Sequence, residues 1–386
     1  MKKICIITGS RAEYYLLKPI MEAIKNDDEL ILQTVVTGSH LSTEFGLTYK
    51  NIEQDGFIID EKVEMLLSSD TKIGINKSIG LAMISFGEVF ERLRPDLIVV
   101  LGDRYEILAV SICAMICNIK IAHLHGGEIT EGAIDDSIRH CITKISHLHF
   151  TSTEDYKKRV IQLGEQPNTV FNVGAIGCEN IKKLNLLNKE DLEKNINFNI
   201  KENTIILTFH PVTLENKSSK EQFQNILDAI DSIENINVIF TKANADTDGR
   251  VINNMIDNYV SKNSNTIAFD TMGQLNYFSA LQFVDAVVGN SSSGIIEVPS
   301  FKIPTVNIGD RQKGRIYADS VINCENEKQE IINAIKKAIS KDFKEEVKNY
   351  NNPYEKENTC KNIIYYIKQF LKNNNENIKK FYDINF

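Results

Sequence analysis

Short apolar runs alternate with amphipathic segments along most of the chain, and this alternation constrains the fold more than any other feature of the sequence. The run KKICIIT at 2–8 predicts a buried strand, and the segment after it has the apolar spacing of a helix. Strands that alternate with helices form a parallel sheet that is covered on both faces. Further strands are predicted at 31–38, 96–102, 120–127, 147–152, 169–175, 203–211, 235–242, 266–270, 284–290 and 303–309.

The chain is long enough for two domains. It has 386 residues, whereas single hydrophobic cores stop growing beyond about 250–300 residues. The alternation restarts at 203 after an Asn- and Lys-rich stretch, so we predict two Rossmann-like, doubly wound α/β domains over 1–170 and 171–365. We expect them to face each other across a cleft in which the ligand binds at the carboxyl ends of the strands. The Asn-rich tail at 371–386 is expected to be a surface helix with a frayed end.

Composition limits the kind of partner. The 44 Lys and Arg residues against 52 Asp and Glu give a net charge of −8, which supplies no general field for nucleic acid. No run approaches the roughly 18 apolar residues of a membrane span. The seven cysteines include no CxxC pair, which is typical of reduced thiols. We therefore expect a soluble cytoplasmic protein that binds neither nucleic acid nor membranes.

A Ser- and Gly-rich loop, GNSSSG at 289–294, follows one predicted strand and opens a predicted helix. Its backbone N–H groups and the hydroxyls of Ser291 and Ser292 would form an anion cradle at a helix N-terminus, although ordinary helix capping would explain the same residues. The loop lacks a Walker lysine and the GxGxxG spacing, so it is neither an NTPase loop nor a dinucleotide site. Guanidinium groups at loop positions can clamp a diphosphate, and a carboxylate in the following helix can accept from ribose hydroxyls. These candidates are Arg11, Arg104, Arg311 and Glu297.

Carboxylates and a histidine follow other predicted strands. Asp103 comes directly after 96–102, Asp135 lies near the start of a predicted helix, and His210 follows the first strand of the second domain. A helix cap would explain Asp103, and salt bridges to Arg139, at i+4 and i+3, would explain Asp135 and its neighbour Asp136. Acid/base chemistry is the functional hypothesis for all three residues.

The motif HxHxxE, formed by His123, His125 and Glu128, raises the question of a metal site. Strand alternation would place both histidines on one face, but the ligand set is incomplete. We therefore expect no metal and no cofactor, and we keep His125 and Glu128 as acid/base candidates. His147 and His149 are expected to be packed or to support other residues.

Taken together, these segments resemble the hydrolysing UDP-N-acetylglucosamine 2-epimerase family, the branch that serves sialic and legionaminic acid pathways. The matching motifs occur in the family's order and reach from the first strand to about residue 315. They are TGSRAEY, LGDRYE, GGEITEGAIDDSIRHCITK, FHPVT and GNSSSGIIEVPSFKIPTVNIGDRQKGR.

The resemblance implies a fold like that of GT-B glycosyltransferases, a homodimer, a UDP-sugar substrate and a C-terminal helix at 366–386 that packs back on the first domain. It ties Asp103, Asp135 and His210 to catalysis and the backbone near Met272 to uracil. It also assigns the diphosphate to Arg11, Arg104, Ser291, Ser292 and Arg311, and the ribose to Glu297.

One position departs from the family pattern. The sialic-acid relatives have an acid/base glutamate where this chain has His125, so Glu128 is the remaining acidic candidate. The histidine is more similar to the legionaminic-type members, which implies a 2,4-diacetamido-2,4,6-trideoxy sugar, UDP-N,N'-diacetylbacillosamine, as substrate beside UDP-GlcNAc.

The chemistry fits this set of residues. A C2 proton beside an acetamido group becomes acidic only as UDP leaves and the ring becomes oxocarbenium-like, and arginines stabilise the departing diphosphate. Loss of the proton gives a glycal; water then adds at C1 and a second acid protonates C2, so two acid/base groups must flank the ring. A GT-B glycosyltransferase, a non-hydrolysing epimerase, a metal-dependent hydrolase and a nucleotide-sugar sensor are the alternatives.

Overall fold

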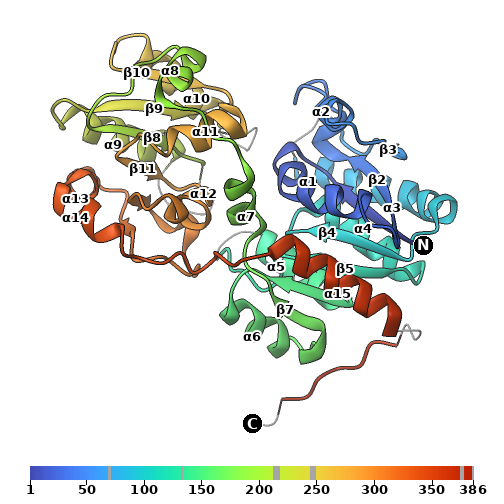
Figure 1. The fold of residues 1–386 in the computed structure, drawn as a ribbon. Coiled ribbons are helices and arrows are strands. Elements are labelled where there is room, and N and C mark those ends of the chain that lie inside the picture. Colours follow the sequence, from blue (N-terminus) through green and yellow to red (C-terminus); the bar gives the residue numbers. More distant parts are fainter. Residues whose placement is uncertain (68–70, 132–133, 212–217, 244–248, 374–377, 385–386) are drawn as a thin grey trace. The chain divides into compact units, whose positions relative to one another are not determined.

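A computed structural model describes residues 1–67, 71–131, 134–211, 218–243, 249–373 and 378–384. The chain divides into two compact units, each of which is described by itself (Figure 1). Unit 1 comprises Met1–Glu128, Ala133–Asn180 and Lys356–Phe386, and unit 2 comprises Ile129–Gly132 and Ile181–Glu355.

Unit 1 is built on a seven-stranded parallel sheet with the order β3-β2-β1-β4-β5-β6-β7. The chain order changes direction between the neighbours β1 and β4, so the loops after these two strands lie at a topological switch point. The strands are β1 (Lys2–Thr8), β2 (Leu30–Thr37), β3 (Glu61–Val63), β4 (Leu97–Leu101), β5 (Lys120–Leu124), β6 (Leu148–Thr151) and β7 (Val170–Asn172). The helices are α1 (Arg11–Lys25), α2 (Tyr49–Gln54), α3 (Lys72–Leu93), α4 (Tyr105–Ile116), α5 (Ile134–Ile145), α6 (Glu154–Gln162), α7 (Ile176–Lys183, which runs into unit 2) and α15 (Thr359–Asn373), with 3-10 turns η1 (Gly38–Leu41) and η2 (Pro167–Thr169).

Alternate residues of β1 face two separate cores. Ile4 and Ile6 belong to the core that α1 and α15 cover, whereas Cys5 and Ile7 belong to the core under α3, α4 and α5. This period of two places helices on both faces of the sheet.

Unit 2 repeats this plan with a six-stranded parallel sheet of order β10-β9-β8-β11-β12-β13. Its switch point lies between β8 and β11, where Val287 is in register with Ile206. The strands are β8 (Thr204–Thr208), β9 (Asn237–Thr241), β10 (Thr266–Phe269), β11 (Ala286–Gly289), β12 (Thr305–Ile308) and β13 (Val321–Cys324). The helices are α8 (Lys189–Ile196), α9 (Ser219–Asp231), α10 (Gly249–Val260), α11 (Gly273–Ala280), α12 (Ser293–Ile296), α13 (Lys328–Ile339) and α14 (Lys341–Val347), with η3 (Val298–Phe301) and η4 (Asp310–Gln312). Two doubly wound parallel sheets are therefore confirmed, and their arrangement across a cleft stays a prediction.

The units change over at 180/181 and 355/356, rather than at 170/171 and 365/366. Strand β7 pairs with β6 and so belongs to the first sheet. Helix α15 packs on α1 through Cys360, Ile363 and Ile367, which are buried in the core of unit 1. The contacts of these two elements extend unit 1 at both boundaries.

Several elements differ from the sequence predictions. Strands β3 and β13 were not predicted, since each has only three or four residues and sits at a sheet edge. The predicted helix at 294–301 is a four-residue helix, α12, followed by the 3-10 turn η3. The predicted tail helix is wrong for 378–384, which are not helical, whereas residues 374–377 lie outside the described ranges.

Within the described residues, α3 alone is long and apolar enough to meet the length and composition of a membrane span. Its residues Ala82, Phe86, Val89 and Phe90 are nevertheless packed in the core of unit 1. Core helices of globular domains commonly meet the same criterion.

Candidate active site

The loops after β1 and β4 are brought together by the pairing of these two strands. The Ser10 hydroxyl caps α1 by accepting from the Glu13 N–H at 3.4 Å, and Glu13 Oε2 accepts from the Gly9 N–H at 2.7 Å. The η1 turn passes close by, because a Cβ at Gly38 would lie only 2.7 Å from the Gly9 carbonyl oxygen. With its φ of +57°, this position requires glycine.

Arg104 lies beside two buried carboxylates. Its Nε and Nη2 donate to Oε1 of Glu106 at 3.2 and 3.1 Å, and its side chain remains 45% exposed. Burial raises the pKa of Glu13 to about 7, and the Glu106 charge adds to this rise, while Arg104 opposes it. The guanidinium predicted to hold a diphosphate is thus held by an ion pair and still reaches solvent.

Asp103 is joined to Arg139. Helix α4 begins at Tyr105 with Arg104 as its N-cap, so the alternative of Asp103 as the helix cap is wrong. Instead, Nη2 of Arg139 donates to Oδ2 of Asp103. Arg139 is 2% exposed, and its Nη1 donates to the Glu128 carbonyl at 2.6 Å and to Asp136 Oδ1 at 3.3 Å. One buried guanidinium therefore joins the loop after β4, the loop after β5 and helix α5.

Asp135 lies in the first turn of α5, close enough to Asp103 for their charges to interact. Burial raises the pKa of Asp135, and the Asp103 carboxylate raises it further, while Arg104 and Arg139 oppose the rise. A carboxyl group whose pKa is raised can hold and release a proton closer to neutral pH.

The side chains of His125 and Glu128 lie in contact as an imidazole–carboxylate pair. The expectation that His123 and His125 share a strand face is wrong, because β5 ends at Leu124 and His125 has a φ of +64°. His125 Nδ1 lies 3.2 Å from Glu128 Oε1, and the Ile176 N–H donates to Nε2 at 3.5 Å, which makes Nδ1 the nitrogen that carries the proton. Glu128 is 3% exposed and also accepts from the Ser152 hydroxyl at 2.8 Å.

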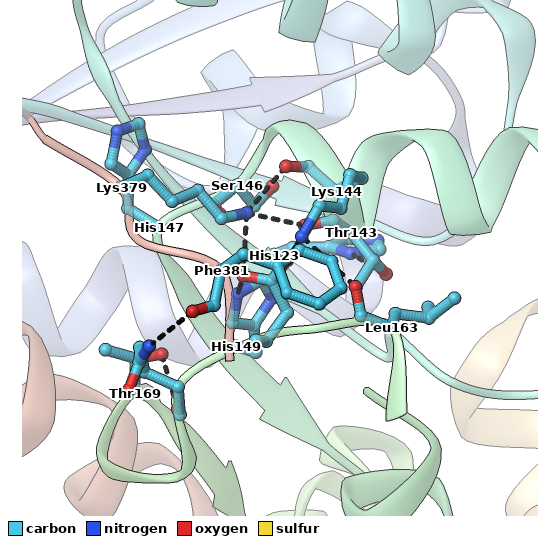
Figure 2. A network of polar contacts seen from close by, with 12 residues as sticks. His123, Thr143, Lys144, Ser146, His147, His149, Leu163, Thr169, Lys379 and Phe381 are labelled. Atoms are coloured by element: carbon cyan, nitrogen blue, oxygen red, sulfur yellow. Dashed lines mark hydrogen bonds and ion pairs between the residues drawn. The ribbon is translucent and has the colours of Figure 1, made fainter. Parts of the chain in front are cut away.

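His123 and His149 lie in the neighbouring strands β5 and β6, in register with each other (Figure 2). His123 Nε2 donates to the Gly102 carbonyl at 2.8 Å, and its Nδ1 lies 3.2 Å from the Thr143 hydroxyl. Burial lowers the pKa of His123 to about 3. His149 contacts Glu165 Oε2 at 3.0 Å, so the prediction that it is packed and supports another residue is confirmed. Through its hydrogen bond to the Gly102 carbonyl, His123 anchors the backbone directly before Asp103.

In unit 2, His210 and Asn290 connect the ends of β8 and β11. The His210 N–H donates to Asn290 Oδ1 at 2.7 Å, and Asn290 Nδ2 donates to the His210 carbonyl at 2.8 Å. Burial lowers the pKa of His210 to about 3, with a further contribution from Arg311. Among the described residues, nothing bonds to its Nδ1.

The Ser-rich loop is shaped by a close approach of two strands. A Cβ at Gly289 would lie 1.8 Å from the Thr208 carbonyl oxygen, so the loop after β11 begins at an obligatory glycine. Ser291 and Ser292 are partly exposed, and the Ser292 carbonyl accepts from the N–H groups of Ile295 and Ile296 at 3.0 Å each. Because α12 has four residues, its dipole is smaller than the predicted helix implied. Glu297 directly follows α12. Desolvation raises the pKa of the partly buried Tyr277, and the Glu297 charge raises it further.

Arg311 and Met272 are placed by backbone contacts. Arg311 Nη1 donates to the Asn290 carbonyl at 2.9 Å, which sets it beside His210. Met272 is buried at the start of α11, and its carbonyl accepts from Asn276 Nδ2 at 3.0 Å. Arg11 differs from Arg104, which pairs with Glu106, and from Arg311, since the part of the chain that the structure describes gives its side chain no hydrogen bond or ion pair.

Groups of three or more His, Cys, Asp or Glu side chains suited to a metal ion are absent from the described ranges. Residues 132–133 and 212–213, which belong to two of the recognised motifs, lie outside those ranges. The structural roles of Glu13, Glu106 and Asn290 were missed in the sequence. The signal for Glu13 was present, because a serine followed three residues later by a glutamate marks a helix start.

Known proteins are similar to this chain over most of its length. A model of the UDP-N-acetylglucosamine 2-epimerase family matches residues 22–368. The chain is 48% identical over 345 residues, 89% of each chain, to a Campylobacter jejuni protein named GDP/UDP-N,N'-diacetylbacillosamine 2-epimerase (hydrolyzing). It is 42% identical to the Escherichia coli polysialic acid biosynthesis protein P7 over 385 residues. The aligned residues cover 100% of this chain and 98% of that protein.

Solved structures support the same fold. The Neisseria meningitidis UDP-GlcNAc 2-epimerase bound to UDP-GlcNAc matches with a TM-score of 0.80 at 18% identity, over 96% of this chain and 100% of that one. The Methanocaldococcus jannaschii UDP-GlcNAc 2-epimerase in complex with UDP-GlcNAc and UDP matches with a TM-score of 0.78 at 20% identity, over 95% and 99%. Both likenesses show the GT-B-like fold. With a family match over most of its length and relatives above 40% identity, the chain belongs to the UDP-N-acetylglucosamine 2-epimerase family.

Proposed function

We propose that this chain is a hydrolysing nucleotide-sugar 2-epimerase, which converts a UDP-linked 2-acetamido sugar and water to UDP and the free 2-epimerised sugar. The observation that carries the proposal is the linked set of Asp103, Arg139 and Glu128, with Asp135 beside it, in a chain of this family. This set contains several groups that can exchange protons within one unit, as the reaction requires.

In the proposed first step, the C1–O bond of the sugar breaks and its electron pair leaves with UDP. The C2–H bond then gives its electrons to a C1=C2 double bond, and its proton passes to a carboxylate. Asp135 suits this transfer because its pKa is raised, whereas Asp103 is engaged by the buried Arg139. The product of this step is a glycal.

In the second step, the oxygen of a water molecule bonds to C1 while an acid delivers a proton to C2 from the opposite face. The water loses one of its protons, which replaces the proton that the acid has given up. The His125–Glu128 pair is the candidate donor, since His125 Nδ1 lies 3.2 Å from Glu128 Oε1. The outcome is a sugar of manno configuration, and the stoichiometry is one UDP released for each water consumed.

We propose roles in nucleotide binding for the residues that the family resemblance assigns. Arg11, the exposed part of Arg104, Ser291, Ser292 and Arg311 would contact the diphosphate. Glu297 would accept from the ribose, and the backbone at Met272 would contact uracil. His210, which the family resemblance ties to catalysis, would lie near the bound diphosphate, because Asn290 contacts both His210 and Arg311.

The names of two relatives point to the sugar. The C. jejuni relative and a Legionella pneumophila relative, 35% identical over 341 residues, are both named for N,N'-diacetylbacillosamine. We therefore propose the diacetamido-trideoxy sugar, in legionaminic or sialic acid synthesis, ahead of UDP-GlcNAc. The test is incubation with each UDP-sugar and identification of the free sugar by NMR; turnover of neither substrate would contradict the proposal.

We also propose a cytoplasmic homodimer. The seven cysteines all lie within the described residues and form no disulfide, as in a reducing compartment. Helix α3 exposes Ile73, Leu81 and Ile84, at 69%, 41% and 71%, which gives a second copy an apolar face to cover. Analytical ultracentrifugation of the parent protein and of the Ile84→Glu variant tests this. We expect the parent to sediment as a dimer and the variant as a monomer.

A further inference from the structure

Residues 378–384 lie along unit 1 as a non-helical segment, here called the C-terminal strap. The strap follows the residues that match the family model, which end at 368. Its backbone is anchored by the Tyr382 N–H, which donates to the Gly164 carbonyl at 2.8 Å. Gln166 Nε2 donates to the carbonyls of Lys380 and Phe381 at 3.4 and 3.2 Å.

Lys379 of the strap contacts the carboxyl end of α5 (Figure 2). Its Nζ donates to the carbonyls of Lys144 at 2.6 Å and Ser146 at 2.5 Å, and it lies 2.6 Å from Glu165 Oε2. The last carbonyls of a helix lack partners within the helix and attract cations. Lys379 therefore supplies from the strap the cation that these carbonyls favour.

Phe381 fixes the strap at a second point. A Cβ at Gly164 would lie 2.2 Å from the Phe381 ring, so the ring rests directly on the glycine backbone. Lys144 Nζ lies 4.5 Å from the ring centroid and 2.9 Å from Glu165 Oε1. The Glu165 carboxylate, only 1% exposed, thus pairs with two ammonium groups, that of Lys144 on α5 and that of Lys379 on the strap.

Helix α5 carries the acid/base groups at its other end. Asp135 and Arg139 lie in its first two turns, and Thr143 near its end contacts His123, which bonds the carbonyl of Gly102. The helix has 12 residues, so a small tilt at the Lys379 end displaces Asp135 relative to Asp103.

We propose that Lys379 is a positioning residue for the reaction: it holds the carboxyl end of α5 and thereby sets Asp135 and Arg139 against Asp103. The inference rests on the proposed function for its kinetic consequence. Its structural part, the restraint of α5, is independent of what the enzyme converts.

The experiment compares Lys379→Met with Lys380→Met. Lys380 is the adjacent strap residue with an exposed side chain, so its variant removes the same charge outside the α5 contact. For Lys379→Met we expect kcat to fall about 10-fold with KM within about twofold, because small displacements of reacting groups act on turnover. Lys379→Arg should restore most of the loss, and Lys380→Met should behave like the parent.

Hydrogen exchange of peptides covering 134–145, read by mass spectrometry, supplies the readout that needs no substrate. Faster exchange in Lys379→Met, with the Lys380→Met variant unchanged, supports the restraint even if the parent converts neither sugar, in which case the proposed function alone has failed. Unchanged exchange and unchanged kcat in Lys379→Met would overturn the inference. A lower melting temperature with unchanged kcat would also overturn it, because the strap would then only stabilise the fold.

Discussion

Arg139, at the second turn of α5, donates a hydrogen bond to Asp103, which lies 36 residues earlier in the loop after β4. The guanidinium is buried, and its other arm bonds the Glu128 carbonyl. A buried cation is retained only where its partners offset the loss of hydration. Asp103 is therefore part of the framework of the site as well as a candidate for its chemistry.

Asn substitutions should separate these two aspartates. For Asp135→Asn we expect kcat to fall about 10²–10⁴-fold with little change in stability, because the residue is proposed to move a proton. For Asp103→Asn we expect a similar loss of kcat and a free energy of unfolding lower by about 1–3 kcal/mol, because Arg139 loses its charged partner. Steady-state kinetics and urea unfolding measure both effects.

Arg311→Ala provides the contrast for these variants. It should raise KM with a smaller effect on kcat, because its proposed role is to bind the diphosphate in the ground state and the transition state alike. Near-parental kcat in both aspartate variants would show that they serve only as structural ion-pair groups.

His125 and Glu128 test the departure from the family pattern. Because the two side chains are bonded, we expect Glu128→Gln to lose at least about 10²-fold in kcat. His125→Ala should lose less if Glu128 is the acid. The opposite order of the two losses would assign the proton to the histidine.

Stability should fall as the pH drops below 6.5. Burial lowers the pKa of His123 to about 3, so the unfolded chain binds a proton between pH 6.5 and 3 that the folded chain does not. The stabilisation is therefore present above pH 6.5 and is lost as the pH falls toward 3, by about 1.4 kcal/mol per pH unit for each such histidine. Burial lowers the pKa of His40 and of His147 to about 4, which acts in the same direction.

The His123→Gln variant checks this assignment. Glutamine can still donate to the Gly102 carbonyl but does not titrate, so the slope of unfolding free energy against pH between 6.5 and 4 should be shallower than in the parent. An unchanged slope would assign the acid sensitivity to other groups.

Activity should survive EDTA and need no nicotinamide. The ring nitrogens of His123 are engaged by Gly102 and Thr143, and His125 by Glu128 and Ile176, so the HxHxxE motif is used in protein contacts. Kinetics after dialysis against EDTA test this expectation. Loss of turnover that zinc or manganese restores would contradict it.

The sequence predicts the parts of this protein that obey a simple periodicity. The buried strands β4, β8 and β11 are continuous apolar runs, and their carboxyl ends locate Asp103, His210 and the Ser-rich loop without further information. Helical spacing also predicts a salt bridge between Arg139 and Asp136, which lies three residues earlier. The structure shows it, with Arg139 Nη1 at 3.3 Å from Asp136 Oδ1.

Contacts between distant segments could not be predicted in this way. The bond from Arg139 to Asp103 depends on how β4 and β5 pair, and the left-handed backbone of His125 ends the strand alternation that the sequence implies. The strap lies in the tail at 371–386 that was predicted as a surface helix with a frayed end, although its asparagines are weak helix formers. Docking on Gly164 and Glu165 decides its conformation instead.

The most direct test of the proposed chemistry is turnover in heavy water. Elimination to a glycal followed by hydration removes the C2 hydrogen and replaces it from solvent, so the released sugar should carry deuterium at C2, have the manno configuration and appear in equal amount with UDP. NMR of the free sugar measures all three. A glycosyltransferase or simple hydrolase breaks only the bond at C1, so a gluco-configured product that retains protium at C2 would contradict the epimerase mechanism.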